Sequence, residues 1–349
     1  MSSAIISHNE EIGKKHESLC NKVAVLGAGS WGTALASQLK KNGNDVYLWG
    51  RNEKVLSQIS NENKNEKYFP SISLTPGIKT TTSIKSAVDN ADLIVFTVPS
   101  NAYRETAVGL HGALKQGSVI VSAAKGIEVE SLKSLSTVLF EEESITSEIT
   151  VLSGPSFALE VIQSLPTAVT IAGRYLNQAA KAAKFFHSET FRVYTSDDLV
   201  GVEFGGVLKN IIALAAGLVE GAGFGQNARA ALITRGLVEM RKIILALGGR
   251  AETVMGLSGM GDLFLTATGD LSRNKRVGYQ LGKGQELAKI LKDLGQVAEA
   301  VNVTDKIYKL AQNLNVEVPI IEQVKCILNG EKNVERVVKD LLSRSPKQE

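Results

Sequence analysis

Residues 22–32 have the sequence KVAVLGAGSWG, and the architecture of the first half of the chain follows from this stretch. Lys22–Leu26 is a short apolar run, typical of a strand that is buried on both faces. Apolar residues then recur at helical spacing over Ser30–Lys41 until Asn42-Gly43, which is a helix stop. Asp45–Trp49 is a second apolar run. A strand, a helix and a strand in such close succession predict a βαβ unit with parallel strands.

Strands and helices continue to alternate to about residue 196. Apolar or β-branched runs predict further strands at 92–98, 118–122, 150–152, 167–172 and 191–195. Beyond them the apolar pattern predicts only helices, at 200–220, 229–247, 284–293, 303–314 and 317–328. We therefore expect a doubly wound, Rossmann-like α/β domain over residues 22–196 and an all-α domain over residues 197–344.

Composition narrows the functional classes. The net charge of +3 comes from 39 basic and 36 acidic residues, which implies no general affinity for nucleic acid or for anionic membranes.

The two cysteines, Cys20 and Cys326, are far apart, and the four histidines lack metal-ligand spacing. We expect free thiols, no metal site and a cytoplasmic protein. Residues 1–21 are polar without the order of a signal peptide, and we expect a disordered extension there.

The loop Gly27-Ala28-Gly29-Ser30-Trp31-Gly32 has the spacing G-x-G-x-x-G between a predicted strand and a predicted helix. The pattern alone is weak, but this context is typical of a dinucleotide-binding loop. Gly27 permits the tight turn, Gly29 lets the backbone approach a pyrophosphate, and Gly32 allows close helix packing. We expect NAD or NADP to bind here; the alternative is a glycine-rich turn without a ligand.

The end of the second predicted strand bears on the choice of cofactor. NAD enzymes often carry Asp or Glu there to hold the ribose hydroxyls, whereas this chain has Trp49-Gly50-Arg51. Arg51 can pair with a 2′-phosphate, so the sequence favours NADPH over NADH. The alternative is a solvated surface arginine.

A lysine lies beside an unusually apolar helix in the second half. The run Ile211–Val219 is too short to span a bilayer and predicts a buried helix, and Lys209 stands just before it. A buried lysine is costly unless it is paired or used, and burial lowers its pKa toward a value that suits proton exchange with a hydroxyl. A lysine that reaches solvent at the helix end is an equal alternative.

Further polar residues accompany this lysine. Asp262 follows a glycine-rich stretch that predicts a flexible loop, where it could orient the lysine, bind a substrate hydroxyl or cap a turn. Asp270–Arg276 gathers three cations at a predicted helix start, typical of an anion site or of an ordinary charged helix face. Residues 123–126 and 154–158 follow strands, at the edge where open α/β sheets bind ligands. Together these features indicate hydride transfer on a small phosphorylated alcohol, with no histidine placed as the base.

At these residues the chain resembles bacterial NAD(P)-dependent glycerol-3-phosphate dehydrogenases, over about residues 22–339. The resemblance rests on GAGSWGTALA, VPS, AAKGIE, GPSFALEV, PTAVTIA, GGVLKNIIALAAGLVEGAGFGQNARAALITRGLVEM, GLSGMGDLFLTATGDLSRNKRVG and GQVAEA. It implies reversible reduction of dihydroxyacetone phosphate to sn-glycerol 3-phosphate, which supplies the backbone for phospholipid synthesis. Ser156 stands where many relatives have threonine, and this change keeps the hydroxyl.

The resemblance also implies roles for individual residues. Lys209 is the proton donor and acceptor, and Asp262 supports it. The implied substrate-binding residues are Lys125, Gly154, Ser156, Lys209, Asp262, Ser272, Arg273 and Asn274. The cofactor-binding residues are Gly27, Gly29, Ser30, Trp31, Gly32, Arg51, Lys125, Ala158, Arg273, Val297 and Glu299.

Two rival functions stay open at this point. A β-hydroxy acid or 6-phosphogluconate dehydrogenase would share both halves and the lysine, but its substrate carries a carboxylate. A redox-sensing NAD(P)-binding protein without catalysis would lack the combination of Lys209, Asp262 and Arg273. We expect a small phosphorylated substrate, no nucleic-acid partner and no stable membrane insertion, and leave a homodimer open.

Overall fold

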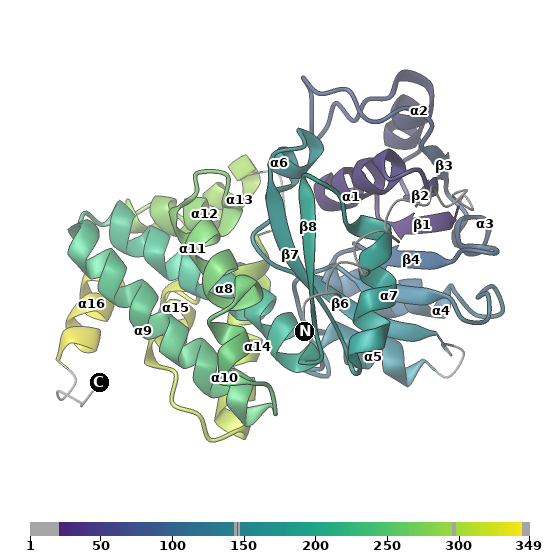
Figure 1. Cartoon of the computed structure of the whole chain (residues 1–349). Coiled ribbons are helices and arrows are strands. Elements are labelled where there is room, and N and C mark those ends of the chain that lie inside the picture. The colour runs from purple at the N-terminus through teal and green to yellow at the C-terminus, as the bar shows by residue number, and fades with distance from the viewer. Residues whose placement is uncertain (1–20, 143–144, 146, 295–297, 344–349) are drawn as a thin grey trace, which may run out of the picture.

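The computed structural model describes residues 21–142, 145, 147–294 and 298–343. One eight-stranded sheet lies beside a bundle of helices (Figure 1). Apart from Asn21, the extension expected over residues 1–21 lies outside the described residues.

The sheet has the strand order β3-β2-β1-β4-β5-β6-β7-β8. Its strands are β1 (Lys22–Leu26), β2 (Asp45–Trp49), β3 (Lys79–Thr81), β4 (Leu93–Phe96), β5 (Val119–Ser122), β6 (Glu148–Ser153), β7 (Thr167–Gly173) and β8 (Phe191–Ser196). The first six pair in parallel in the 3-2-1-4-5-6 order of a Rossmann fold, which confirms the predicted fold class. β7 pairs antiparallel with β6 and parallel with β8. The short β3, with the sequence KTT, has no apolar pattern and was not predicted.

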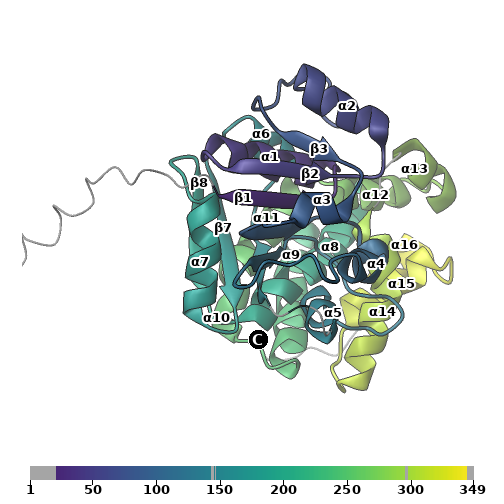
Figure 2. The same cartoon turned by 90° about the vertical axis from the view of Figure 1, so that its right-hand side faces the viewer.

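Helices cover both faces of the sheet, which is why its central strands β4 and β5 are buried at every position (Figures 1 and 2). Core residues of one face lie on α1 (Ser30–Lys41), α2 (Glu53–Glu62), α6 (Ala158–Ile162) and α7 (Leu176–Phe186). Core residues of the other face lie on α3 (Ile84–Val88), α4 (Tyr103–Val108) and α5 (Leu135–Glu141). The 3₁₀ turn η2 (Ser100–Ala102) follows β4.

After residue 196 the described residues form helices and no strand. They are α8 (Leu199–Gly221), α9 (Gly225–Ala246), α10 (Ala251–Val254), the π-helical turn η3 (Leu257–Gly261), α11 (Asp262–Thr268), α12 (Arg273–Gly282), α13 (Leu287–Leu294), α14 (Glu299–Asn313), α15 (Pro319–Leu328) and α16 (Val334–Leu342). The division into domains at residues 196 and 197 stays a prediction. α10, α11 and α16 were not predicted, whereas the predicted helix start at 270–276 is confirmed by α12.

α8 is the central helix of this second part. It packs against α9, α11 and α12, and also against β6, whose last residue Ser153 lies close to Gly206 of α8. It is long and apolar enough to cross a bilayer, yet 94% of its most apolar window is buried inside the protein. The prediction of a buried helix at 211–219 is therefore confirmed. Because β6 ends beside it, α8 carries Lys209 to the carboxyl-terminal edge of the sheet.

Candidate active site

The glycine-rich loop after β1 has the geometry that a dinucleotide requires. Gly27 has a φ of +121°, and a Cβ at Gly32 would lie 1.8 Å from the carbonyl oxygen of Gly27. Only glycine fits either position. Gly29 precedes α1, whose N-terminus has neither a side-chain cap nor an acidic residue in its first turn. The backbone N–H groups there suit a pyrophosphate, so the residues present fit NAD or NADP.

The other residues expected at the cofactor lie around this loop. The indole Nε1 of Trp31 donates a hydrogen bond of 3.0 Å to the carbonyl oxygen of Ala123, which joins α1 to the end of β5. Trp31 and Ala158, the first residue of α6, pack against the same core cluster. Ser30 begins α1, and Arg51 is exposed just beyond β2.

A cluster of two lysines and one aspartate lies where α8 meets the edge of the sheet. Nζ of Lys209 is 3.0 Å from Oδ1 of Asp262 and 2.6 Å from Oγ1 of Thr266. Nζ of Lys125, in the segment after β5, is 2.6 Å from the other carboxylate oxygen of Asp262. Lys209 is 6% exposed, so its amine is paired inside the protein and does not reach solvent at the helix end.

Burial and neighbouring charges set the protonation of this cluster. Burial lowers the pKa of Lys209 to about 8; Asp262 opposes the shift, and the positive charges of Lys125 and Arg273 add to it. Burial alone would raise the pKa of Asp262, but the charges of the two lysines outweigh it and hold that pKa below its ordinary value. Lys209 can therefore gain and lose a proton near neutral pH while Asp262 stays ionised.

Asp262 does not lie in a flexible loop, and that expectation was wrong. It is the first residue of α11, directly after η3, and is 1% exposed. The glycines that suggested a loop instead allow tight packing, since a Cβ at Gly259 would lie 2.0 Å from the carbonyl oxygen of Val254. The carboxylate is thus held rigidly between the lysines.

Two further groups line the same space. The carbonyl oxygen of Gly154 accepts hydrogen bonds from Nζ of Lys125 at 3.1 Å and from Oγ of Ser156 at 2.9 Å. The amide of Asn274 donates to Oδ1 of Asn210 at 2.9 Å and accepts from the backbone N–H of Ala300 at 3.1 Å. These bonds fix the amide, whose second N–H can still donate to a substrate oxygen.

The start of α12 supplies only part of the expected cation cluster. Ser272 is the N-cap, its hydroxyl accepting from the backbone N–H of Lys275, and Arg273 is the first, exposed residue of the helix. The side chain of Lys275 turns away to Glu220 and Asp270, at 3.5 and 3.1 Å. The expectation that it contributes to an anion site was therefore wrong, because two carboxylates outside the site hold it.

The remaining expected residues lie near the cofactor side. Glu299 begins α14; burial raises its pKa, and the charge of Arg273 opposes that shift. A Cβ at Gly126 would lie 3.7 Å from Oε2 of Glu299, so this carboxyl group faces the segment that carries Lys125. Val297 lies outside the described residues.

Thr266 and Asn210 belong to the cluster, but sequence reasoning assigned them no role. Thr266 stands four residues after Asp262, so both lie on one face of α11, and its hydroxyl bonds Lys209. Asn210 directly follows Lys209 and orients Asn274. The i, i+4 spacing would have identified Thr266 if α11 had been recognised as a helix.

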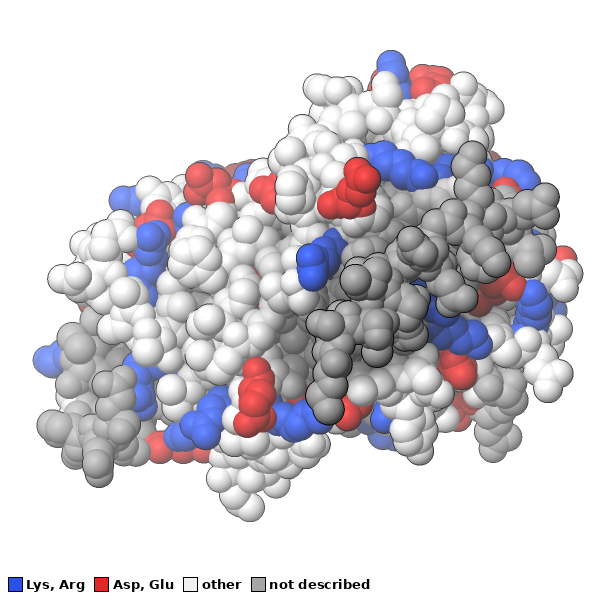
Figure 3. All heavy atoms as spheres, viewed as in Figure 1, with Lys and Arg blue, Asp and Glu red and all other residues white. Residues whose placement is uncertain are grey.

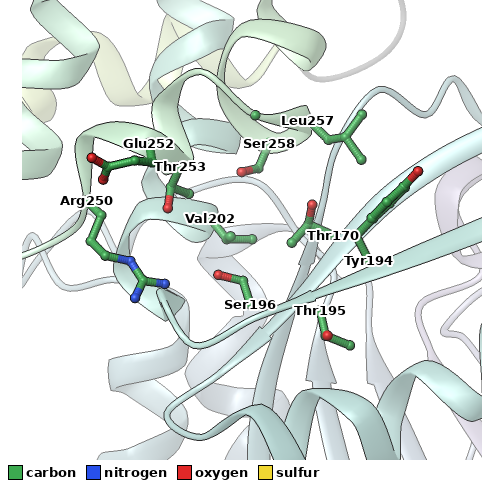
Figure 4. A pocket seen from close by; sticks show the side chains of 11 residues that line it. Thr170, Tyr194, Thr195, Ser196, Val202, Arg250, Glu252, Thr253, Leu257 and Ser258 are labelled. Carbon is green, nitrogen blue, oxygen red and sulfur yellow. The ribbon is translucent and has the colours of Figure 1, made fainter. Parts of the chain in front are cut away.

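A separate pocket of about 530 Å³ lies where β7 and β8 meet α8, α10 and η3 (Figure 4). Hydroxyl groups of Thr170, Ser196, Thr253 and Ser258 line it. Arg250 is the one cation among its lining residues, all of them described, and it pairs with Asp197. None of the expected site residues lines this pocket, so we place the chemistry at the lysine cluster.

Within the described residues no group of three or more His, Cys, Asp or Glu side chains could hold a metal ion. Cys326 is a buried free thiol, and Cys20 lies outside the described residues. The arrangement thus combines a dinucleotide loop, a proton-exchanging amine and an excess of positive charge. These are the requirements for hydride and proton transfer on a small anion.

Comparison with known proteins agrees with this geometry. The family model for the N-terminus of NAD-dependent glycerol-3-phosphate dehydrogenase matches residues 22–179, and the model for its C-terminus matches residues 198–339. Glycerol-3-phosphate dehydrogenase [NAD(P)+] from Stenotrophomonas maltophilia strain K279a is 44% identical, over 94% of this chain and 96% of the relative. The enzyme of that name from Syntrophotalea carbinolica is 46% identical, over 94% and 99%.

Solved structures lead to the same family. The crystal structure of glycerol-3-phosphate dehydrogenase from Coxiella burnetii has a TM-score of 0.87 and 37% identity, and the match covers 92% of this chain and 98% of that one. A ketopantoate reductase from Ralstonia eutropha, with a TM-score of 0.56 and 17% identity, shares the fold alone.

Proposed function

The chain belongs to the NAD-dependent glycerol-3-phosphate dehydrogenase family, and on that premise we propose that Lys209 is its proton donor and acceptor. The chain is an oxidoreductase that uses NAD or NADP and interconverts dihydroxyacetone phosphate and sn-glycerol 3-phosphate. The observation that carries the proposal is the buried amine of Lys209, which is bonded to Asp262 and Thr266 at the edge of the sheet. We also propose that the enzyme supplies sn-glycerol 3-phosphate for phospholipid synthesis and that it is located in the cytoplasm.

The mechanism assigns each group of the cluster one task. NAD(P)H, which the glycine-rich loop before α1 would hold, would supply the hydride. The Lys209 ammonium polarises the ketone and donates a proton to the new alkoxide oxygen, while Asp262 and Thr266 hold the amine in place. Lys125 contacts both substrate and cofactor. Ser272, Arg273 and Asn274, at the start of α12, bind the substrate phosphate and glycerol oxygens, and Gly154 and Ser156 also contact the substrate.

The direct test is oxidation of NADPH or NADH in the presence of dihydroxyacetone phosphate. Turnover with this ketone and none with 6-phosphogluconate or a β-hydroxy acid supports the proposed substrate. Preference for a carboxylate substrate would overturn it.

The rate should depend on pH through Lys209. Reduction uses the ammonium form, so we expect kcat/KM for dihydroxyacetone phosphate to fall as the pH rises through about 8. Oxidation of glycerol 3-phosphate uses the free amine, so its kcat/KM should rise over the same range. Initial rates in both directions between about pH 6.5 and 9.5 check this. Profiles that change in the same direction would contradict the role of Lys209.

The preference for NADPH rests on Arg51. It is exposed at the end of β2, where no carboxylate stands to hold a ribose hydroxyl. We expect Arg51→Ala to weaken NADPH binding about 5- to 30-fold and to leave NADH binding unchanged, because only NADPH carries the 2′-phosphate. Fluorescence titration with both reduced cofactors measures this, with exposed Arg192→Ala on β8 as the control. Tight NADH and negligible NADPH binding by the parent enzyme would refute the preference.

The helical part offers a surface for the homodimer that the sequence left open. Exposed apolar side chains occur there at Met255, Met260 and Phe264. Figure 3 shows broad uncharged areas over this part, between scattered charges of both signs. The homodimer stays a prediction.

A further inference from the structure

Glu203 is a buried carboxylate that the mechanism above does not use. It lies on α8, six residues before Lys209, and is 4% exposed. One carboxylate oxygen accepts from the backbone N–H of Ser136 at 2.8 Å, and the other accepts from Oγ of Ser136 at 2.5 Å. These bonds attach α8 to the first turn of α5, a helix that belongs to the sheet layer.

The bonds between Glu203 and Ser136 bear on the lysine cluster, because α5 directly follows the segment that carries Lys125. This segment, residues 123–134, leaves β5 and ends at Ser134, the N-cap of α5. The strand residue directly before it, Ser122, is bonded to Tyr103, whose hydroxyl lies 2.6 Å from Oγ of Ser122. Within the segment, Ile127 packs against the helical part, because it is fully buried in the same core cluster as the apolar residues of α8.

Besides the packing of Ile127, two polar contacts therefore join this segment and the helix after it to the helical part. The first runs from Lys125 through Asp262 to Lys209, and the second from Ser136 to Glu203. We propose that Glu203 is a positioning residue, which holds the Lys125 segment against α8 so that Lys125 and Lys209 share Asp262. The inference rests on the proposed roles of the two lysines.

The protein contains a matched control for a purely structural role. Glu239 on α9 is also 4% exposed, and its carboxylate accepts from the backbone N–H groups of Ile320 and Ile321 at 2.7 and 3.1 Å. It thus binds the start of α15 as Glu203 binds the start of α5. Both of its helices belong to the helical part, and neither carries a residue of the lysine cluster.

The test compares Glu203→Gln with Glu239→Gln in the full-length chain. We expect Glu203→Gln to lower kcat/KM for dihydroxyacetone phosphate by at least about tenfold, because small displacements of reacting groups have effects of this size. Glu239→Gln should stay within about twofold of the parent enzyme, although thermal unfolding should show that both variants lose stability. Equal kinetics in the two variants would overturn the proposal.

The pH profile provides a readout that lost stability alone would not change. The charged groups that face Lys209 are Asp262 on α11, Lys125 in the segment after β5 and Arg273 on α12. If the segment moves away in Glu203→Gln, Lys125 no longer lowers the pKa of Lys209 and no longer competes for Asp262. The alkaline fall in kcat/KM should then shift to higher pH in this variant and stay in place in Glu239→Gln. An unshifted profile in Glu203→Gln would count against positioning.

Ser136→Ala supplies a second variant, which keeps the measurement possible if Glu203→Gln does not fold. It removes only the hydroxyl donor from the partner helix, so we expect the same shift of the pH profile and a smaller fall in kcat/KM; parent-like kinetics would overturn the proposal. A failure of the proposed function is a separate result. It would show as a parent enzyme that does not reduce dihydroxyacetone phosphate, or as Lys209→Ala with normal turnover.

Discussion

Replacing Lys209 with alanine is expected to lower kcat for dihydroxyacetone phosphate reduction on the order of 10³-fold or more, with little change in NADPH binding. The alkoxide that forms on hydride transfer would lose both its proton donor and the positive charge that stabilises it. The protein should still fold, because Asp262 keeps its bond to Lys125 at 2.6 Å when Lys209 is removed. Steady-state kinetics and fluorescence titration with NADPH measure the two effects separately.

A second buried lysine supplies the control for Lys209→Ala. Lys275 is 7% exposed, against 6% for Lys209, but its amine bonds Asp270 and the carbonyl oxygen of Thr268 outside the cluster. Lys275→Ala should lose stability and keep kcat within a few-fold of the parent enzyme. Near-normal turnover in Lys209→Ala would end the lysine proposal, whereas loss of NADPH binding would show that the variant is damaged beyond the proton donor.

The sequence predicted those parts of the fold that local patterns encode. The βαβ unit at residues 22–49 follows from apolar runs and glycine spacing, and its strands pair as expected. The antiparallel pairing of β7 with β6 was not expected, because strand direction depends on the path of the chain between Ser153 and Thr167. Nothing in the β-rich sequence of residues 167–172 distinguishes the two directions.

Some residues of the candidate site were predicted from local sequence and others were not. Asp262 was considered as a partner of Lys209 because a buried lysine needs one. In the structure Nζ of Lys209 lies 3.0 Å from Oδ1 of Asp262. Thr266 was missed because glycines at 256, 259 and 261 made the stretch before it look like a loop. Lys275 was misplaced although one of its partners, Asp270, stands only five residues before it. Its other partner, Glu220, lies on α8, and such a long-range pair leaves no local signal.

The low helix propensity of glycine is the reason why a loop was predicted at residues 256–262. Glycine disfavours helices in isolation, so its repetition predicts a flexible loop. Here a Cβ at Gly205 would lie 2.6 Å from the carbonyl oxygen of Ser258, so α8 and η3 approach closely through residues without side chains. Tertiary packing decides the conformation, and it also holds Asp262 in place.

Replacing Arg273 with alanine should have the largest effect on substrate binding. Arg273 begins α12 beside the N-cap Ser272, where a guanidinium group and the N–H groups of the helix N-terminus can together hold a phosphate. Losing a charge-paired contact of this kind is expected to lower kcat/KM for dihydroxyacetone phosphate by about 2–5 kcal/mol, or roughly 30-fold to several thousand-fold. The loss should appear mainly in KM, because the phosphate does not change in the reaction and is held equally in the bound substrate and in the transition state.

Unphosphorylated dihydroxyacetone shows whether Arg273 acts through the phosphate. The parent enzyme should use it poorly, and Arg273→Ala should use it no worse, because the missing contact has no counterpart on this substrate. Arg273→Lys should fall between parent and alanine variant, since an ammonium keeps the charge but cannot form two parallel hydrogen bonds with a phosphate. An equal loss of activity on both substrates, together with weaker NADPH binding, would instead assign Arg273 to the cofactor. Glu299 on α14, whose carboxyl group interacts with the charge of Arg273, would then contact the cofactor as well.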